Sequence, residues 1–408
     1  RRAGGPGDDR SSPRAAERFA CFRSAVSRGH QHVQREQESR SRRCEKARAR
    51  AAEAPGGQRG SLDRRFRERE HLGLLAKCRA WSTDDFVSLR VLGRGAFGTV
   101  HLVQHRQDGQ RYALKQIGKS RYCSKNRRRL FLERDALAAA RGRWCVGLHA
   151  TFQDAEHVYM LMDFLPGGDL MFHLMERDRF TAAETAFYMA ELLEGLDVVH
   201  KLGFLHRDVK PDNLVLGSTG HLKLLDFGLA RQAGAGEPDA QVGTFEYMAP
   251  EVFFGGAACG PELDLWSVGV VAFECLAGGI PFNMNHLQGQ AGYECMRRDL
   301  ANHREVFAEC LRMTSAAGVT DAAAKQLLSR LVCPKELRLS VEMARREPFF
   351  AGLDFGELHL REAPFARACA AAAGRWNFDD LGSQALPPAA RLSATDELEW
   401  AWYDFDRE

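Results

Sequence analysis

Alternating apolar and polar residues predict a β-rich region that starts just after residue 80. Residues 87–92 and 100–103 alternate in this way on either side of a glycine-rich turn, as half-buried strands do. The same pattern predicts further strands at 111–115, near 151–152 and at 157–162. Residues 128–140 are predicted to form a helix between the third and fourth strands. The region is therefore expected to be a small, mostly antiparallel lobe with one helix.

Helical periodicity dominates after Pro166-Gly167-Gly168 and extends over residues 169–349, with an interruption at 203–250. Within it, several apolar residues fall on one helix face at i, i+3 and i+4 spacing, namely Leu192, Leu193, Leu196 and Val199. Past residue 350 the sequence becomes rich in Ala, Gly and Pro. The pattern predicts an α+β protein with a small β lobe, a large helical lobe and a C-terminal extension at 351–408.

Residues 1–80 contain few large apolar residues and are predicted to be disordered, with short helices an alternative at 34–52 and 62–79. They contain 21 Lys/Arg and 10 Asp/Glu, a net charge of +11, whereas the rest of the chain has 36 and 44, a net charge of −8. A basic arm of this kind suits an acidic protein, an anionic membrane surface or nucleic acid. Nucleic acid is not expected as a partner, because the arm has no recognised motif and no interleaved aromatic residues.

The eleven cysteines are scattered and include no Cys-x-x-Cys pair. This pattern disfavours a zinc site or a disulfide framework and favours a reducing compartment. No apolar run reaches about 18 residues, so no transmembrane helix is expected. We therefore expect a cytoplasmic location, with the nucleus as an alternative.

The turn between the first two strands has the sequence Gly93-Arg94-Gly95-Ala96-Phe97-Gly98. Glycines let a backbone approach the phosphates of a nucleotide closely, although a glycine-rich hairpin without a ligand remains an alternative. A dinucleotide-binding fold would need a helix directly after the glycines. Here a strand follows, with Ala113 and Lys115 on the next one, and this order is typical of protein kinases.

The strongest chemical signal is the segment His206-Arg207-Asp208-Val209-Lys210-Pro211-Asp212-Asn213, followed by Asp226-Phe227-Gly228 and Ala249-Pro250-Glu251. Phosphoryl transfer needs an oriented nucleophile, a clamped polyphosphate and metal to neutralise charge. We expect Asp208 to accept the proton of the substrate hydroxyl and Lys210 to reach the transferring phosphoryl group. Asn213 and Asp226 are expected to be Mg²⁺ ligands.

An ion pair is expected behind the glycine-rich turn. Lys115 is predicted to hold the α- and β-phosphates, and Glu133, on the predicted helix, is its predicted partner. An inert strand lysine is the alternative for Lys115 taken alone.

With these motifs in this order, residues 86–350 resemble a eukaryotic protein kinase domain, and Lys210 resembles the serine/threonine class. The resemblance implies the two-lobed kinase fold, ATP and Mg²⁺ as cofactors, and proteins as substrates. It makes Met162 the gatekeeper and 163–165 the hinge, and it pairs Arg338 with Glu251. The other residues that it implies for nucleotide binding are Leu92, Gly93, Gly95, Phe97, Gly98, Val100, Ala113, Asp163, Leu165, Asp169, Val215 and Phe378, and Thr244 is implied beside the catalytic loop.

Residues 242–251 are similar to those of the AGC group, whose C-terminal tail returns across the small lobe. Residues 363–365 resemble the start of that tail, 377–380 the segment whose Phe378 approaches the adenine pocket, and 400–405 the closing hydrophobic motif. Among AGC branches the chain is most like the nuclear-Dbf2-related kinases, whose basic arm binds a small adaptor protein of the Mob type. The long insert that those kinases carry near the end of the activation segment is absent here.

Two positions depart from the AGC pattern. Ala240 stands where these kinases carry a phosphorylated Ser or Thr, and residues 229–243 contain no Ser, Thr or Tyr. Asp404 stands in the Ser/Thr position of the hydrophobic motif. We therefore hypothesise a kinase that is constitutively competent or regulated by a partner. A poorly active, decaying enzyme is the alternative.

Substrate preference is indicated by three carboxylates. Asp169, Asp212 and Glu274 match acidic positions that hold arginines N-terminal to the target residue in Arg-directed AGC kinases. Phe245 replaces the usual Pro, which leaves the pocket for the residue after the target undefined. The competing function is a pseudokinase or scaffold. Such proteins usually lack the lysine, the catalytic aspartate or the metal aspartate, and this chain has all three.

Overall fold

The computed structural model describes most of the chain from Trp81 to Ala371 and three positions beyond it. The described residues are 81–95, 98–121, 124–140, 142–234, 242–255, 260–282, 290–316, 321–371, 386 and 405–406. The predictions made for the basic arm and for Phe97, Ala240, Phe378 and Asp404 lie outside the described residues.

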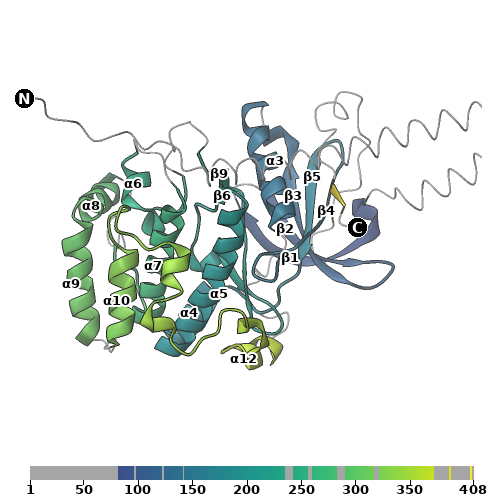
Figure 1. The fold of residues 1–408 in the computed structure, drawn as a ribbon. Helices are drawn as coiled ribbons and strands as arrows, with labels where there is room; N and C mark the ends of the chain where they lie inside the picture. Colours follow the sequence, from purple (N-terminus) through teal and green to yellow (C-terminus); the bar gives the residue numbers. More distant parts are fainter. Residues whose placement is uncertain are drawn as a thin grey trace, which may run out of the picture. The chain divides into compact units, whose positions relative to one another are not determined.

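The small lobe contains a six-stranded antiparallel sheet in the spatial order β1-β2-β3-β5-β4-β10 (Figure 1). Its strands are β1 (Phe86–Gly95), β2 (Gly98–His105), β3 (Arg111–Gly118), β4 (Leu148–Gln153), β5 (His157–Asp163) and β10 (Phe405–Asp406). Its helix is α3 (Ser124–Ala139). The predicted strands and helix are confirmed. β1 and β2 are longer than predicted because their pairing continues into the glycine-rich turn, as far as the pair Gly95–Gly98.

One core cluster of the small lobe lies on one face of this sheet. It is formed by Phe86, Val103, Leu114, Ala150, Phe152, Tyr159 and Leu161, all buried. The rings of Phe152 and Tyr159 stack with their centroids 4.9 Å apart. Trp81, Tyr112 and Leu386 pack against this cluster from its margin.

The C-terminal extension contacts both lobes at its described positions. Its start lies on the large lobe, where the Phe365 ring is buried and stacks on His173 at 4.9 Å. Further along, Leu386 packs on the core of the small lobe. β10 then pairs with β4, with Phe405 opposite Thr151. The predicted return of the tail to the small lobe is therefore confirmed at these positions.

The large lobe is mainly helical, as predicted. Its helices are α4 (Leu170–Arg177), α5 (Ala182–Lys201), α6 (Pro250–Phe253), α7 (Glu262–Ala277), α8 (Gln290–Ala301), α9 (His303–Ala316), α10 (Ala322–Leu331), α11 (Val341–Ala344) and α12 (Ala366–Ala371). α7 is buried along its length from Leu263 to Leu276. The apolar face predicted for α5 is buried as well. A capping box between Thr181 and Glu184 fixes the start of α5.

Four short strands lie in the interruption between the helices. β6 (Phe204–Leu205) pairs with β9 (Arg231–Gln232), and β7 (Leu214–Leu216) pairs with β8 (Leu222–Leu224). Strands of two or three residues are too short to show an alternation in the sequence, which is why they were not predicted. They hold the segment 206–213 between them.

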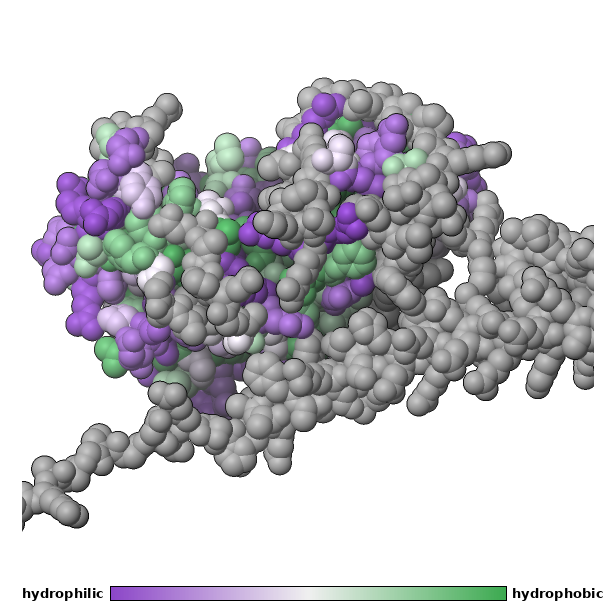
Figure 2. Space-filling model, turned by 90° about the horizontal axis from the view of Figure 1, so that it is seen from above, coloured by the Kyte–Doolittle hydropathy of each residue, from purple (hydrophilic) through white to green (hydrophobic). Residues whose placement is uncertain are grey.

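The outer side of the large lobe is solvated. Figure 2 shows hydrophilic residues along the left-hand edge of the face seen, on the side of α8 and α9, and hydrophobic residues nearer the middle. On α8 the side chains of Arg297 and Arg298 are mostly exposed. In the described part of the chain, no helix is long and apolar enough to cross a membrane.

Candidate active site

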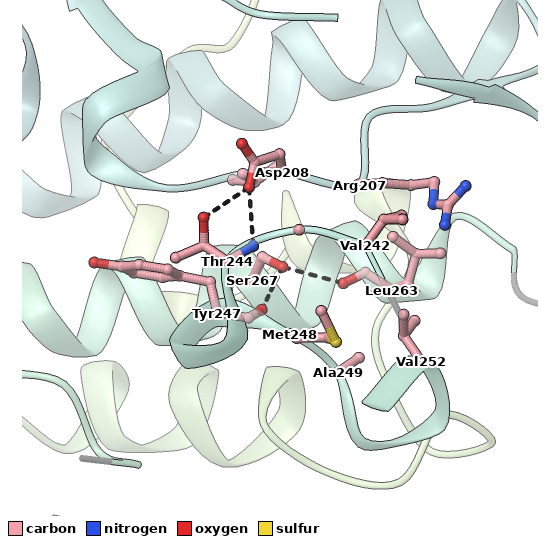
Figure 3. A pocket seen from close by; sticks show the side chains of 12 residues that line it. Arg207, Asp208, Val242, Thr244, Tyr247, Met248, Ala249, Val252, Leu263 and Ser267 are labelled. Atoms are coloured by element: carbon pink, nitrogen blue, oxygen red, sulfur yellow. Dashed lines mark hydrogen bonds between the residues drawn. The ribbon is translucent and has the colours of Figure 1, made fainter. Parts of the chain in front are cut away.

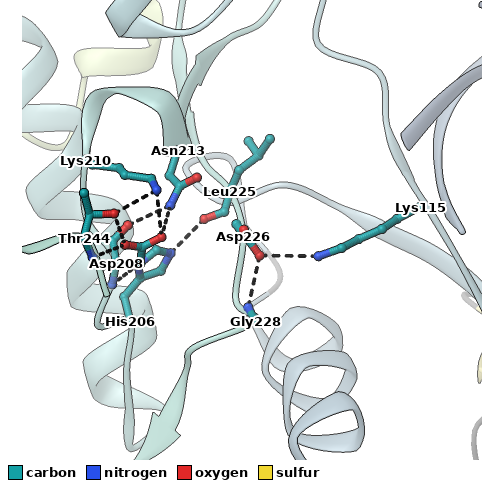
Figure 4. A network of polar contacts seen from close by, with 9 residues as sticks. All are labelled: Lys115, His206, Asp208, Lys210, Asn213, Leu225, Asp226, Gly228 and Thr244. Atoms are coloured by element: carbon teal, nitrogen blue, oxygen red, sulfur yellow. Dashed lines mark hydrogen bonds and ion pairs between the residues drawn. The ribbon is translucent and has the colours of Figure 1, made fainter. Parts of the chain in front are cut away.

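Four of the predicted residues converge at the loop between β6 and β7 (Figure 4). The Asp208 carboxylate accepts hydrogen bonds from Thr244 Oγ1 at 2.9 Å and from Asn213 Nδ2 at 3.0 Å. Lys210 Nζ lies 3.3 Å from the same carboxylate and donates to Thr244 Oγ1 at 2.9 Å. The short helix Pro211–Asn213 brings Asn213 back toward Asp208. A carboxylate held in this way presents a fixed acceptor to an incoming hydroxyl group.

A buried carboxylate on α7 supports this loop. Asp264 is fully buried and accepts hydrogen bonds from the backbone N–H groups of His206 at 2.9 Å and Arg207 at 2.8 Å. Its third contact is with Nε2 of His200, at 2.8 Å. Burial alone would raise the pKa of Asp264, but these contacts hold it below its usual value. Arg207 has a φ of 72°, a conformation that costs energy for a residue with a side chain, and the two anchored N–H groups offset that cost.

The predicted ion pair of the small lobe is formed. Lys115 Nζ donates to Glu133 Oε1 at 2.7 Å, and Asp226 Oδ1 lies 3.4 Å away on the other side. Burial would lower the pKa of Lys115, but the two carboxylates raise it well above its usual value, so this lysine keeps its charge. The Lys115 charge in turn lowers the pKa of Asp226. Lys115, Glu133 and Asp226 therefore stand in the arrangement that phosphoryl transfer requires.

A cavity of about 310 Å³ lies between the sheet and the large lobe. Every residue predicted to bind the nucleotide and described by the structure lines it: Leu92, Gly93, Gly95, Gly98, Val100, Ala113, Lys115, Met162, Asp163, Leu165, Asp169 and Val215. Glu133, Asn213 and Asp226 line it as well. Its volume falls within the range of small-molecule sites, and its wall is mostly apolar with a few charged groups.

The glycines of the turn differ in what their surroundings allow. A Cβ atom on Gly93 or Gly95 would meet nothing within 4 Å, so a side chain would have open space at these positions. A Cβ atom on Gly98 would lie 2.1 Å from the carbonyl oxygen of Gln116 on β3. Gly98 is therefore required by the close approach of β2 to β3, a reason independent of any nucleotide.

The oxygen donors of Asn213 and Asp226, which line the cavity, fit Mg²⁺. Asn213 and Asp226 offer hard oxygen atoms, and the Nδ2 of Asn213 already donates to Asp208, which leaves its Oδ1 as the available atom. Mg²⁺ is typically held by one or two protein oxygens, with waters and substrate phosphates completing its coordination.

The hinge is fixed by the side chain of Asp163. Its carboxylate accepts a hydrogen bond from the backbone N–H of Gly147 at 2.9 Å and one from Lys223 Nζ on β8 at 3.0 Å, and it lies 2.8 Å from His149 Nε2. Burial alone would raise the pKa of Asp163, but the contacts with His149 and Lys223 hold it far below its usual value. The hinge is thereby tied to both lobes.

The segment 242–249 forms a loop directly beside the catalytic residues (Figure 3). Ser267 Oγ donates to the carbonyl oxygen of Tyr247 at 2.7 Å, and the Tyr247 hydroxyl donates to Glu274 Oε2 at 2.8 Å. Gly243 has a φ of 116°, and a Cβ atom there would lie 2.8 Å from the carbonyl oxygen of Arg207. At the end of the loop, the predicted pair of Arg338 with Glu251 is present, with two nitrogen–oxygen contacts of 2.5 and 3.2 Å.

Comparison with known proteins assigns this architecture. The model of the protein kinase domain matches residues 86–350. The chain belongs to the protein kinase family. It is 36% identical to the serine/threonine-protein kinase MRCK gamma of Mus musculus over 72% of this chain and 19% of that protein. It is 31% identical to the serine/threonine-protein kinase CBK1 of Yarrowia lipolytica over 88% of this chain and 70% of that protein. It is 32% identical to the serine/threonine-protein kinase tricornered of Drosophila pseudoobscura over 85% of this chain and 82% of that protein.

These matches confirm the recognition of a serine/threonine kinase of the AGC group, related to the nuclear-Dbf2-related branch. The two-lobed kinase fold is confirmed too. The kinase spans about a fifth of MRCK gamma and most of CBK1 and tricornered.

Of the three carboxylates predicted to bind substrate arginines, Asp212 and Glu274 influence each other electrostatically. Burial, together with the charges of Asp212 and Glu246, raises the pKa of Glu274 to about 7, against the hydrogen bond from Tyr247. Asp169 has a different setting. It lines the nucleotide cavity and caps α4, accepting a hydrogen bond from the N–H of Phe172 at 2.7 Å.

Several residues of the kinase site were not predicted from the sequence. Leu137, Val146, Gly168 and Leu225 also line the cavity, as does Phe164, which was predicted only as part of the hinge. Leu137 follows Glu133 by four residues on α3, so helical periodicity would have placed both on one face. Leu225 directly precedes Asp226, which is a comparable local signal. Val146 has no such signal, because it enters the site through the pairing of its loop with β8.

Proposed function

We propose that this kinase transfers the γ-phosphoryl group of ATP to serine and threonine hydroxyl groups of proteins. The observation that supports this most directly is the convergence of Lys210, Asn213 and Thr244 on Asp208, next to a cavity that contains the Lys115–Glu133 pair. Lys115 orients the phosphates, Asp208 accepts the proton of the attacking hydroxyl, and Lys210 stabilises the charge on the phosphoryl group. Mg²⁺, held by Asn213 and Asp226, would supply electrostatic stabilisation of the polyphosphate.

We further propose a preference for arginine on the N-terminal side of the target residue. Arginine pairs with carboxylates through two parallel hydrogen bonds, and Asp212, Glu246 and Glu274 provide acidic groups beside the substrate loop. Asp169 adds a carboxylate at the edge of the nucleotide cavity.

Regulation is proposed to be independent of phosphorylation in residues 229–243, since this stretch contains no hydroxyl group. The net charge of +11 over residues 1–80 and the similarity to the nuclear-Dbf2-related branch support a Mob-type adaptor as the partner of the basic arm. A cytoplasmic location, with the nucleus as the alternative, rests on cysteine usage alone.

The test is transfer of labelled phosphate from Mg-ATP to a peptide with arginines N-terminal to a single serine. The protein is treated with phosphatase first, and the Asp208→Asn variant is the matched control. We expect transfer by the wild-type chain and a loss of at least about a hundredfold in the variant, because the general base is removed. Binding of Mg-ATP without transfer to any peptide would refute the proposal and favour a pseudokinase or scaffold.

A further inference from the structure

The unusual residue Phe245 is part of an aromatic cluster that joins three elements. It lies in the short helix Phe245–Tyr247 of the substrate loop. Its ring meets that of Phe253 on α6 edge-on at 5.9 Å and that of Tyr293 on α8 edge-on at 6.4 Å. Phe253 and Tyr293 also stack on each other at 5.3 Å. A proline at position 245 has no aromatic ring and would make none of these ring contacts.

The position of Phe245 in the loop gives these contacts a functional setting. Directly before it, Thr244 binds Asp208 and Lys210. Two residues after it, Tyr247 binds Glu274 and Ser267. The loop is thus bonded to the catalytic residues through Thr244 and to α7 through Tyr247, and the Phe245 ring adds a third attachment, to α6 and α8.

Phe245 differs from an ordinary core residue in its exposure. Phe253 is only 1% exposed, whereas Phe245 and Tyr293 are partly exposed. Edge-to-face ring pairs stabilise a structure beyond the burial of their area. The chain also lacks any hydroxyl group in residues 229–243, so no phosphate on that stretch can order the loop.

We propose that Phe245 is a positioning residue for the peptide substrate, which fixes the loop 242–249 through Phe253 and Tyr293. The expected effect on peptide kinetics rests on the proposed kinase function. In this chain the packing of the rings orders the loop in place of a phosphate. The ring acts through the loop and not on the nucleotide, so peptide recognition depends on it while ATP binding does not.

Kinetics of Phe245→Ala test this directly, with Phe254→Ala as the matched control. Phe254 is the neighbouring ring, 47% exposed, and it contacts Phe253 at 5.3 Å. For Phe245→Ala we expect peptide kcat/KM to fall about tenfold, from the loss of two ring pairs. The KM for ATP should stay within about twofold, because the residues that line the nucleotide cavity lie outside this loop. Tyr293→Ala should have a similar effect, and adding it to Phe245→Ala should change little. Phe245→Tyr should restore most of the activity.

Three results would overturn the inference: unchanged peptide kinetics in Phe245→Ala, an equal change in the KM for ATP, or an equal effect of Phe254→Ala. A wild-type chain that phosphorylates no peptide would refute the proposed function instead. Hydrogen exchange of the backbone amides of residues 242–249 then tests the inference, because this measurement does not require enzymatic activity. Faster exchange in Phe245→Ala than in the wild-type and Phe254→Ala chains supports it, and equal exchange in all three contradicts it.

Discussion

The raised pKa of Glu274 predicts that recognition of arginine depends on pH near neutrality. Glu274 is largely buried, its pKa is raised to about 7 by burial and by the charges of Asp212 and Glu246, and Tyr247 donates a hydrogen bond to it. Below its pKa the carboxyl group is neutral and binds arginine weakly. Above its pKa the carboxylate pairs with the guanidinium group. Affinity for an arginine-containing peptide should therefore rise as the pH rises through 7.

The magnitude follows from the titration. About one tenth of the Glu274 side chains are ionised at pH 6 and about nine tenths at pH 8 for a pKa near 7. If only the carboxylate binds arginine, KM for the peptide falls by about tenfold over this interval. Bound arginine further stabilises the carboxylate, so the midpoint in the complex lies below that of the free enzyme.

The assay compares two peptides that differ only in arginine or alanine N-terminal to the serine. The ratio of their kcat/KM values, measured between pH 6 and pH 8, cancels the titration of groups that both peptides use. The Glu274→Gln variant is the control, because glutamine can still accept the Tyr247 hydrogen bond but does not ionise. A ratio that is flat over this range, or that rises equally in the variant, would refute the assignment of Glu274 to arginine recognition.

Two further predictions concern stability. Asp264→Asn should lower the free energy of unfolding by about 3 kcal/mol and reduce kcat, since one of the two buried carboxylate oxygens is replaced by an NH2 group that cannot accept a hydrogen bond. Urea unfolding that shows a loss below about 1 kcal/mol would contradict this. Gly98→Ala should lower the melting temperature of the nucleotide-free protein by about 4 °C or more, because the new Cβ atom meets Gln116. Gly93→Ala, where the space is open, should leave that temperature unchanged, and equal melting of the two variants would show that the strand contact is unimportant.

The sequence predicted the chemistry of the site better than the contacts that support it. Lys115 and Glu133 are predicted to pair, and Asp226 is predicted to bind metal, because their motifs occur in a fixed order; the structure brings both carboxylates within hydrogen-bonding distance of Lys115. The alternation of apolar residues also predicted the five main strands of the small lobe, because each is long enough to show a period of two.

The supporting contacts join residues that are far apart in the sequence. The Asp163 side chain reaches Lys223 on β8, and Phe245 reaches Tyr293 on α8. No local pattern indicates such pairs, since neither residue of a pair constrains its own neighbours. The substitution at position 245 was visible in the sequence as a departure from the family, but its meaning depends on which ring the fold brings beside it.

The pairing of β10 with β4 has a consequence for solubility. Without β10, β4 would be the outer strand of its side of the sheet, with a row of unpaired N–H and C=O groups. Such an edge is a template on which another copy of the chain can add a strand, and it leads to aggregation. Residues 405–406 occupy this edge at Ala150 and Thr151. The C-terminal extension therefore covers part of an edge that would otherwise be open to a second strand.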